Sequence, residues 1–167
     1  MSQPALQLAV IGGATCGDRH RSLALETGRA IADAGAVLLC GGRGGVMAAA
    51  AEGARIAGGR TVGILPGASA AETPANPDIE LAIYTGLGQA RNQILVLSAA
   101  AVIGIGGGWG TLTEIGLARK HQIPVILLES WHLERPDGIS EAGLMQADNA
   151  QEAVALALAA IDQRGTR

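Results

Sequence analysis

Short apolar runs alternate with helical patterns along most of the chain. Continuous apolar runs are typical of buried parallel strands, whereas apolar residues that recur every three or four positions are typical of helices packed on one face. The runs predict strands over residues 6–11, 36–40, 61–65, 79–84, 100–105 and 124–128. Helical spacing predicts helices over residues 18–34, 46–57, 89–98, 111–121 and 149–163, with Asp18 as the N-cap of the first.

Strand, glycine turn and helix in repeated order predict an α/β fold. We expect a single domain over residues 1–167: a doubly wound, Rossmann-like parallel sheet with helices on both faces. The proline-containing stretch 67–77 is interpreted as a loop, and residues 129–148 show no regular pattern. In such a sheet every glycine turn lies at the same edge, where ligands bind.

Composition narrows the classes of function. The 167 residues carry 12 Lys+Arg against 15 Asp+Glu, a formal charge of −3, and contain no basic run, which argues against a nucleic-acid partner. Two cysteines, Cys16 and Cys40, are too few for a disulfide scaffold and fit a reducing compartment. The first ten residues lack a signal-peptide pattern, and the longest apolar stretch, 94–105, is too short for a membrane helix. We therefore expect a cytoplasmic protein without a membrane partner.

Three glycine clusters follow predicted strands. Backbone N–H groups can approach an anion closely at such turns, and a helix start favours the anion electrostatically. Cations stand beside these turns at predicted helix starts, where they oppose the helix dipole unless an anion is bound. One cluster alone would be only a tight turn, but three at one edge indicate a phosphate site. The residues concerned are Gly12, Gly13, Gly41, Gly42, Gly44, Gly45 and Gly106–Gly110, with Arg19, His20, Arg21, Arg43 and Arg91 as the cations.

The densest candidate segment is Gly106–Glu114. Gly107, Gly108 and Gly110 can wrap a phosphate, Thr111 can add a hydroxyl donor, and Trp109 can stack on a flat ring or cover the site. On the motif alone, Thr111 and Glu114 form a helix-capping box, a purely structural role for that glutamate.

Several other chemistries find no support in the sequence. No Walker phosphate-binding motif and no Gly-x-Gly-x-x-Gly after the first strand are present. No residues have metal-ligand spacing. The one lysine, Lys120, lies at a predicted helix end, which argues against a pyridoxal-phosphate enzyme.

The run 41–67, then Arg91, then GGGWGTLTE at 106–114, resembles the LOG family of Rossmann-like nucleotide-binding proteins, part of the SLOG superfamily formerly called lysine decarboxylase-like. The family hallmark is PGGxGTxxE preceded by an arginine on the previous helix, and the similarity covers roughly residues 6–128. This chain departs from the pattern at Gly106, where the family has Pro, at Asn92 in place of Lys, and at Thr113 in place of an acid. It also lacks the family's Met-His before Arg91. These departures resemble the branch that contains molybdenum-cofactor carrier proteins.

The resemblance implies two functions. As an enzyme, the protein would be a nucleoside 5′-monophosphate phosphoribohydrolase that releases free base, with Glu114 and Arg91 as catalytic residues. As a carrier or sensor, it would bind a phosphorylated pterin or nucleotide such as molybdenum cofactor, and Glu114 would be only a cap. Either reading implies a small phosphorylated ligand, no required cofactor and no metal, and relatives suggest a homo-oligomer. The binding residues expected are Gly12, Gly13, Gly41, Gly42, Arg43, Gly44, Gly107, Gly108, Trp109, Gly110 and Thr111.

Overall fold

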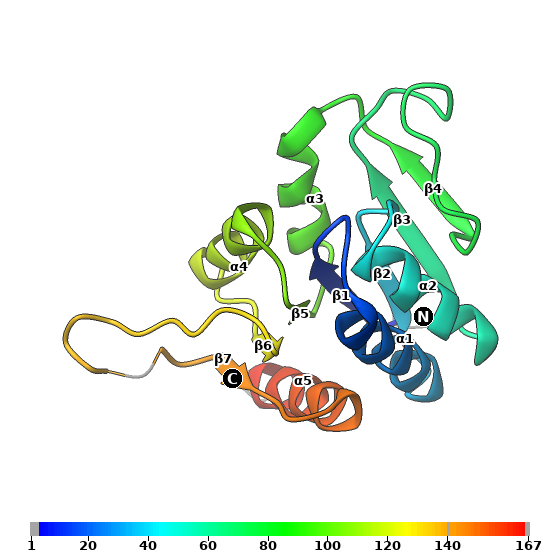
Figure 1. Cartoon of the computed structure of the whole chain (residues 1–167). Coiled ribbons are helices and arrows are strands. Elements are labelled where there is room, and N and C mark those ends of the chain that lie inside the picture. Colours follow the sequence, from blue (N-terminus) through cyan, green and yellow to red (C-terminus); the bar gives the residue numbers. More distant parts are fainter. Residues whose placement is uncertain (1–3, 140, 166–167) are drawn as a thin grey trace.

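The computed structural model describes residues 4–139 and 141–165, and these residues contain one seven-stranded parallel sheet in the order β4-β3-β2-β1-β5-β6-β7 (Figure 1). The strands are β1 (Gln7–Gly12), β2 (Val37–Cys40), β3 (Thr61–Leu65), β4 (Leu81–Tyr84), β5 (Ala101–Ile105), β6 (Val125–Leu128) and β7 (Leu144–Gln146). The helices are α1 (Asp18–Asp33), α2 (Val46–Ile56), the 3₁₀ turn η1 (Gly88–Ala90), α3 (Arg91–Leu97), α4 (Trp109–Lys120) and α5 (Ala150–Gly165).

The predicted α/β class and doubly wound sheet are confirmed, but two details differ. The pattern missed β7, because two of its three residues are only partly buried, the third, Gln146, is exposed, and they form no long apolar run. The predicted N-cap at Asp18 is wrong by one residue: Gly17 is the N-cap, and Asp18 begins α1 with its carboxylate near the positive helix end. Residues 1–3, part of the segment without a signal-peptide pattern, lie outside the described residues.

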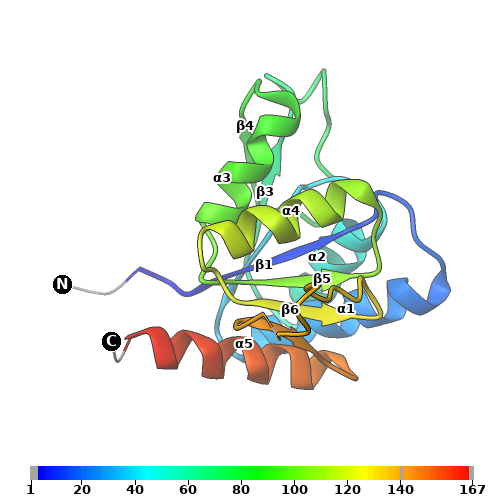
Figure 2. The same cartoon turned by 90° about the vertical axis from the view of Figure 1, so that its left-hand side faces the viewer.

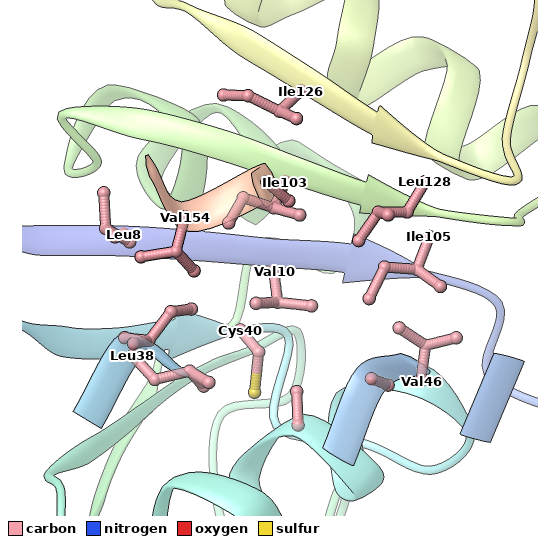
Figure 3. Packing of buried hydrophobic residues seen from close by; sticks show 14 of the residues in the cluster. Leu8, Val10, Leu38, Cys40, Val46, Ile103, Ile105, Ile126, Leu128 and Val154 are labelled. Atoms are coloured by element: carbon pink, nitrogen blue, oxygen red, sulfur yellow. The ribbon is translucent and has the colours of Figure 1, made fainter. Parts of the chain in front are cut away.

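Helices cover both faces of the sheet, so the core has two halves. Successive residues of β1 point to opposite faces. Leu8 and Val10 pack with residues of α1, α2 and α5, whereas Ala9 and Ile11 pack with residues of α3 and α4. Figure 2 shows α4 on one side of β1 and β5, with α1 and α5 on the other. Figure 3 shows the packing in the half of the core that contains Leu8 and Val10. Each strand of the centre is therefore buried on both faces, which explains its continuous apolar run.

The strand order changes direction at β1. The chain builds β2, β3 and β4 on one side of β1, and then returns to place β5, β6 and β7 on the other. The carboxyl ends of β1 and β5 are neighbours, paired at Gly12 and Ile105. In open α/β sheets this change of direction creates the crevice where ligands bind. Among the described residues, none of the helices is long and apolar enough to cross a membrane.

The glycine-rich composition permits a very close crossing of α1 and α2. A Cβ atom at Gly28 would overlap the backbone carbonyl oxygen of Ala50, and one at Gly53 would overlap that of Leu25. The atoms that would be struck belong to helix backbones, which cannot move aside as flexible side chains can. Glycine at these two positions therefore sets the distance between the helices.

This crossing generates a stability prediction. Gly28→Ala should lower the free energy of unfolding by roughly 1–3 kcal/mol or more, because the added methyl group overpacks a backbone contact. Gly116→Ala in α4 is the matched control: its added Cβ meets open space, so the better helix propensity of alanine should raise stability by about 1 kcal/mol. Urea unfolding followed by circular dichroism measures both, and equal effects of the two substitutions would contradict the close-contact argument.

Candidate functional site at the carboxyl edge of the sheet

A cavity of about 200 Å³ opens where β1 and β2 end and where α3 and α4 begin. We call it the Arg91 cavity. Nine residues predicted from the sequence line it: Gly12, Gly13, Gly41, Arg43, Arg91, Gly108, Gly110, Thr111 and Glu114. The fold thus brings together residues from three separate glycine turns and two helices, as the common edge of a parallel sheet requires.

Arg91 places a buried guanidinium at this cavity. It is the first residue of α3 and is only 8% exposed, and its Nε and Nη1 atoms are buried without a hydrogen-bond partner. Burial lowers its pKa, while the negative charge of Glu114 acts in the opposite direction. An unpaired buried cation is costly, so a site of this kind is complete only when an anion is present.

The turn after β2 forms the wall beside Arg91. A Cβ at Gly41 would lie 2.7 Å from the Arg91 Nη2 atom, so a larger residue at this position would displace the guanidinium from its present place. Asn76 fixes the same turn from the far side: its backbone N–H donates to the Gly42 carbonyl (2.9 Å) and its side-chain amide donates to the Arg43 carbonyl (2.9 Å). Two carbonyl oxygens of the turn are thereby engaged by Asn76.

Glu114 also lines the Arg91 cavity and brings a buried carboxyl group to it, 7% exposed. Burial raises its pKa to about 7, although the positive charge of Arg91 acts to lower it. The predicted capping box is wrong, because α4 begins at Trp109 with Gly108 as its N-cap. Thr111 is then the third and Glu114 the sixth residue of the helix, too far along for a cap. The capping role therefore does not account for Glu114.

The remaining predicted binding residues lie outside the Arg91 cavity. Gly42 is buried behind the turn, and Gly44 lines a neighbouring hollow together with Arg43. Gly107 lines a shallow depression beside His20. Trp109 is 76% exposed, with its ring tilted 45° against that of Trp131 at a centroid distance of 5.3 Å.

The charge argument for an anion is wrong for two of the cations. Arg19 pairs with Glu129, and Arg21 pairs with Glu52 at 2.6 Å. Their partners are 110 and 31 residues away in the sequence, so the pattern around α1 could not reveal them. Arg43 and Arg91 are the two that reach the Arg91 cavity.

Sequence reasoning missed two polar residues of the cavity, Gln89 and Asn92. Gln89 lies in η1, two residues before Arg91, and Asn92 follows Arg91 in α3. Their closeness to Arg91 in the sequence is the one signal that could have indicated them. Asn92 is 7% exposed and its side-chain oxygen is buried without a partner. An unpaired buried acceptor beside an unpaired buried cation is typical of a site that a polar ligand completes.

Neither the thiols nor the single lysine belong to the cavity lining. Burial raises the pKa of Cys40 to about 11, so its thiol is inert, and Cys16 is half-buried against the core. Lys120 ends α4 and lines the neighbouring groove between α3 and α4. The described residues contain no cluster of three or more His, Cys, Asp or Glu side chains that could hold a metal ion.

The buried carboxyl group predicts a pH dependence of stability. Its pKa in the folded protein lies above the ordinary value of 4.5, so the folded state loses stability as the pH rises from about 4.5 through about 7. Glu114→Gln carries no charge, and its stability advantage over the natural protein should grow to roughly 2–3 kcal/mol at pH 8. Thermal unfolding from pH 4.5 to 8 measures this advantage. Glu80→Gln, on the surface, controls for loss of a charge, and a constant advantage across the pH range would contradict the burial argument.

Comparison with known proteins identifies the family of this chain and several relatives. A family model described as the SLOG cluster4 family matches residues 5–158. A cytokinin riboside 5′-monophosphate phosphoribohydrolase of Mycobacterium tuberculosis is 35% identical over 116 residues, which cover 65% of this chain and 62% of that protein.

Two solved structures are similar over nearly their whole length. The molybdenum cofactor binding protein of Rippkaea orientalis has a TM-score of 0.87 at 38% identity, covering 96% of this chain and 99% of that one. The molybdenum cofactor carrier protein of Chlamydomonas reinhardtii has a TM-score of 0.81 at 32% identity, covering 94% and 99%. The family model spans all seven strands and every residue of the Arg91 cavity. The chain therefore belongs to the SLOG cluster4 family.

Proposed function

We propose that the Arg91 cavity binds the phosphoryl group of a nucleotide-like ligand. The observation that carries this proposal is the buried Arg91 guanidinium, whose Nε and Nη1 have no partner within the protein. Arg43 adds a second cation at the rim. The start of α4 adds backbone N–H donors, because Gly108 supplies no side-chain cap and the helix dipole favours negative charge there.

On this site the reaction we favour is hydrolysis of the N-glycosidic bond of a nucleoside 5′-monophosphate. The Glu114 carboxylate stabilises positive charge on the ribose as the bond from C1′ to the base nitrogen breaks. The same carboxylate takes a proton from the water that attacks C1′ and passes it to the departing base. The products are the free base and ribose 5-phosphate. A carboxyl group with a pKa of about 7 is well matched to such proton transfer at neutral pH.

A second candidate is a carrier of a phosphorylated pterin such as molybdenum cofactor. The observation that favours it is similarity over 99% of their lengths to a molybdenum cofactor binding protein and to a molybdenum cofactor carrier protein. The alignment with the mycobacterial phosphoribohydrolase, in contrast, covers 62% of that protein. A carrier needs the phosphate site but no catalytic carboxylate. Both functions therefore use Arg91 to bind phosphate, but only the hydrolase uses Glu114 as a catalytic carboxylate.

The phosphate site is tested by binding of ribose 5-phosphate. Arg91→Met keeps a long apolar stem but removes the charge, and it should weaken binding at least tenfold, because a charge-assisted contact is worth about 1.5–3 kcal/mol. Arg60→Met, at an exposed ion pair away from the cavity, should leave the affinity unchanged. Isothermal calorimetry measures both, and undiminished binding by Arg91→Met would refute the assignment.

Catalysis is tested by chromatography of free base released from a panel of nucleoside 5′-monophosphates. Glu114→Gln should abolish release while leaving ribose 5-phosphate binding in place. In the natural protein, kcat/KM should rise with pH and level off above about 7, because the carboxylate is the working form. Release that survives Glu114→Gln would reject the role of Glu114. No release from any nucleotide would favour the carrier, to be followed by mass spectrometry of the co-purified ligand.

A further inference from the structure

A second, larger hollow adjoins the Arg91 cavity. It lies between α3 and α4, has a volume of about 750 Å³, and we call it the α3–α4 groove. Gln89, Asn92 and Gly110 line both spaces, so the two are continuous. The other residues of the groove are Ala90, Trp109, Thr113, Gly116, Leu117 and Lys120.

The Arg91 cavity is too small for a whole nucleotide-like ligand. Its volume of about 200 Å³ lies below the roughly 300–1,000 Å³ of ordinary ligand pockets. A ligand held there by its phosphoryl group must extend into an adjoining space. Two such spaces share residues with the cavity: the α3–α4 groove, and a hollow of about 460 Å³ beside the loop that follows β3, which shares Arg43.

The two spaces differ in chemistry. The α3–α4 groove offers the indole of Trp109, which is 76% exposed and follows directly on the glycine turn that lines the phosphate cavity. Leu117, Ala90 and two glycines give it a mainly apolar lining. The loop hollow contains no aromatic side chain and carries the Glu72 carboxylate. A flat apolar ring gains stacking and burial only in the groove.

A polar group stands where the cavity and the groove meet. Asn92 lines both, is 7% exposed, and has a side-chain oxygen that is buried without a partner. An oxygen in this position can accept a hydrogen bond from a ring N–H or amino group, or from a sugar hydroxyl between ring and phosphate. Binding would thus satisfy an acceptor that the folded protein leaves unpaired.

We propose that the α3–α4 groove is the ring subsite of this ligand, and that it takes a bicyclic heteroaromatic ring stacked on Trp109 and hydrogen-bonded to Asn92. The proposal rests on the phosphate site proposed above and names the class of the group attached to that phosphate. Adenine, guanine and pterin share this ring shape, so the subsite serves the hydrolase and the carrier alike.

The groove can be filled without touching the phosphate cavity. A side chain at Gly116 meets open space and lies on the groove, so Gly116→Leu narrows the groove while the helix keeps a good helix former. Ala75→Leu fills the loop hollow in the same way and is the matched control. Calorimetry with adenosine 5′-monophosphate and with ribose 5-phosphate separates ring contacts from phosphate contacts.

We expect Gly116→Leu to weaken the binding of adenosine 5′-monophosphate about tenfold, the equivalent of one lost stacking contact. The affinity for ribose 5-phosphate should change less than twofold. Ala75→Leu should change neither. In Trp131→Phe, Trp109 is the one remaining tryptophan of the sequence. Adenosine 5′-monophosphate should quench the fluorescence of Trp109 in this variant, and ribose 5-phosphate should not.

Four results would overturn the proposal in distinguishable ways. Selective loss of the nucleotide in Ala75→Leu would place the ring in the loop hollow. Equal affinity for the nucleotide and ribose 5-phosphate in every variant would mean that the ring makes no contact. A change of sedimentation mass in Gly116→Leu would assign the groove to a second copy of the chain. Absence of binding by both ligands in the natural protein would instead defeat the phosphate site itself.

Discussion

The positive charge of Arg91 is buried, and several neighbouring residues are arranged around it. The wall beside it is a glycine because a Cβ would strike the guanidinium. Glu114 lines the same cavity, and its carboxyl group and the Arg91 guanidinium each shift the pKa of the other. Desolvating a cation without a partner costs free energy, which the rest of the fold must supply. This cost is the physical basis of the proposal that an anion binds there.

The scaffold that supplies this free energy is made of small side chains. The chain has 25 glycines and no phenylalanine, so its core is built from aliphatic residues and from helices that approach closely. The crossing of α1 and α2 at Gly28 and Gly53 is the tightest example. These helices cover one face of the sheet, and α3 and α4 cover the other and carry Arg91 and Glu114. The Arg91 cavity lies at the carboxyl edge of the sheet and is lined by residues from both halves of the core, Val10 and Met47 from one and Ile11 from the other.

Membership of the SLOG cluster4 family is compatible with the proposed hydrolase and with the proposed carrier, because both would use the phosphate site that we propose at Arg91. Glu114 is the residue at which they part. A buried carboxylate with a raised pKa lowers stability at neutral pH, so its presence needs a reason. Proton transfer in a hydrolase is such a reason. A carrier would tolerate a neutral residue at position 114. The similarity to molybdenum cofactor proteins over 99% of their lengths supports the carrier as the second proposed function.

The amino-acid sequence by itself determined the fold class, six of the seven strands and the edge where the site lies. It could do so because buried parallel strands are continuous apolar runs and because glycine turns punctuate them. It missed β7, which is short and has no fully buried residue. It mistook Thr111 and Glu114 for a capping box, because α4 begins two residues earlier than the pattern implies, with Gly108 as its N-cap. It also could not see that Glu129 and Glu52 neutralise Arg19 and Arg21, or that Asn92 stands unpaired beside Arg91. Those facts depend on contacts between distant segments and on burial, which only the tertiary structure decides.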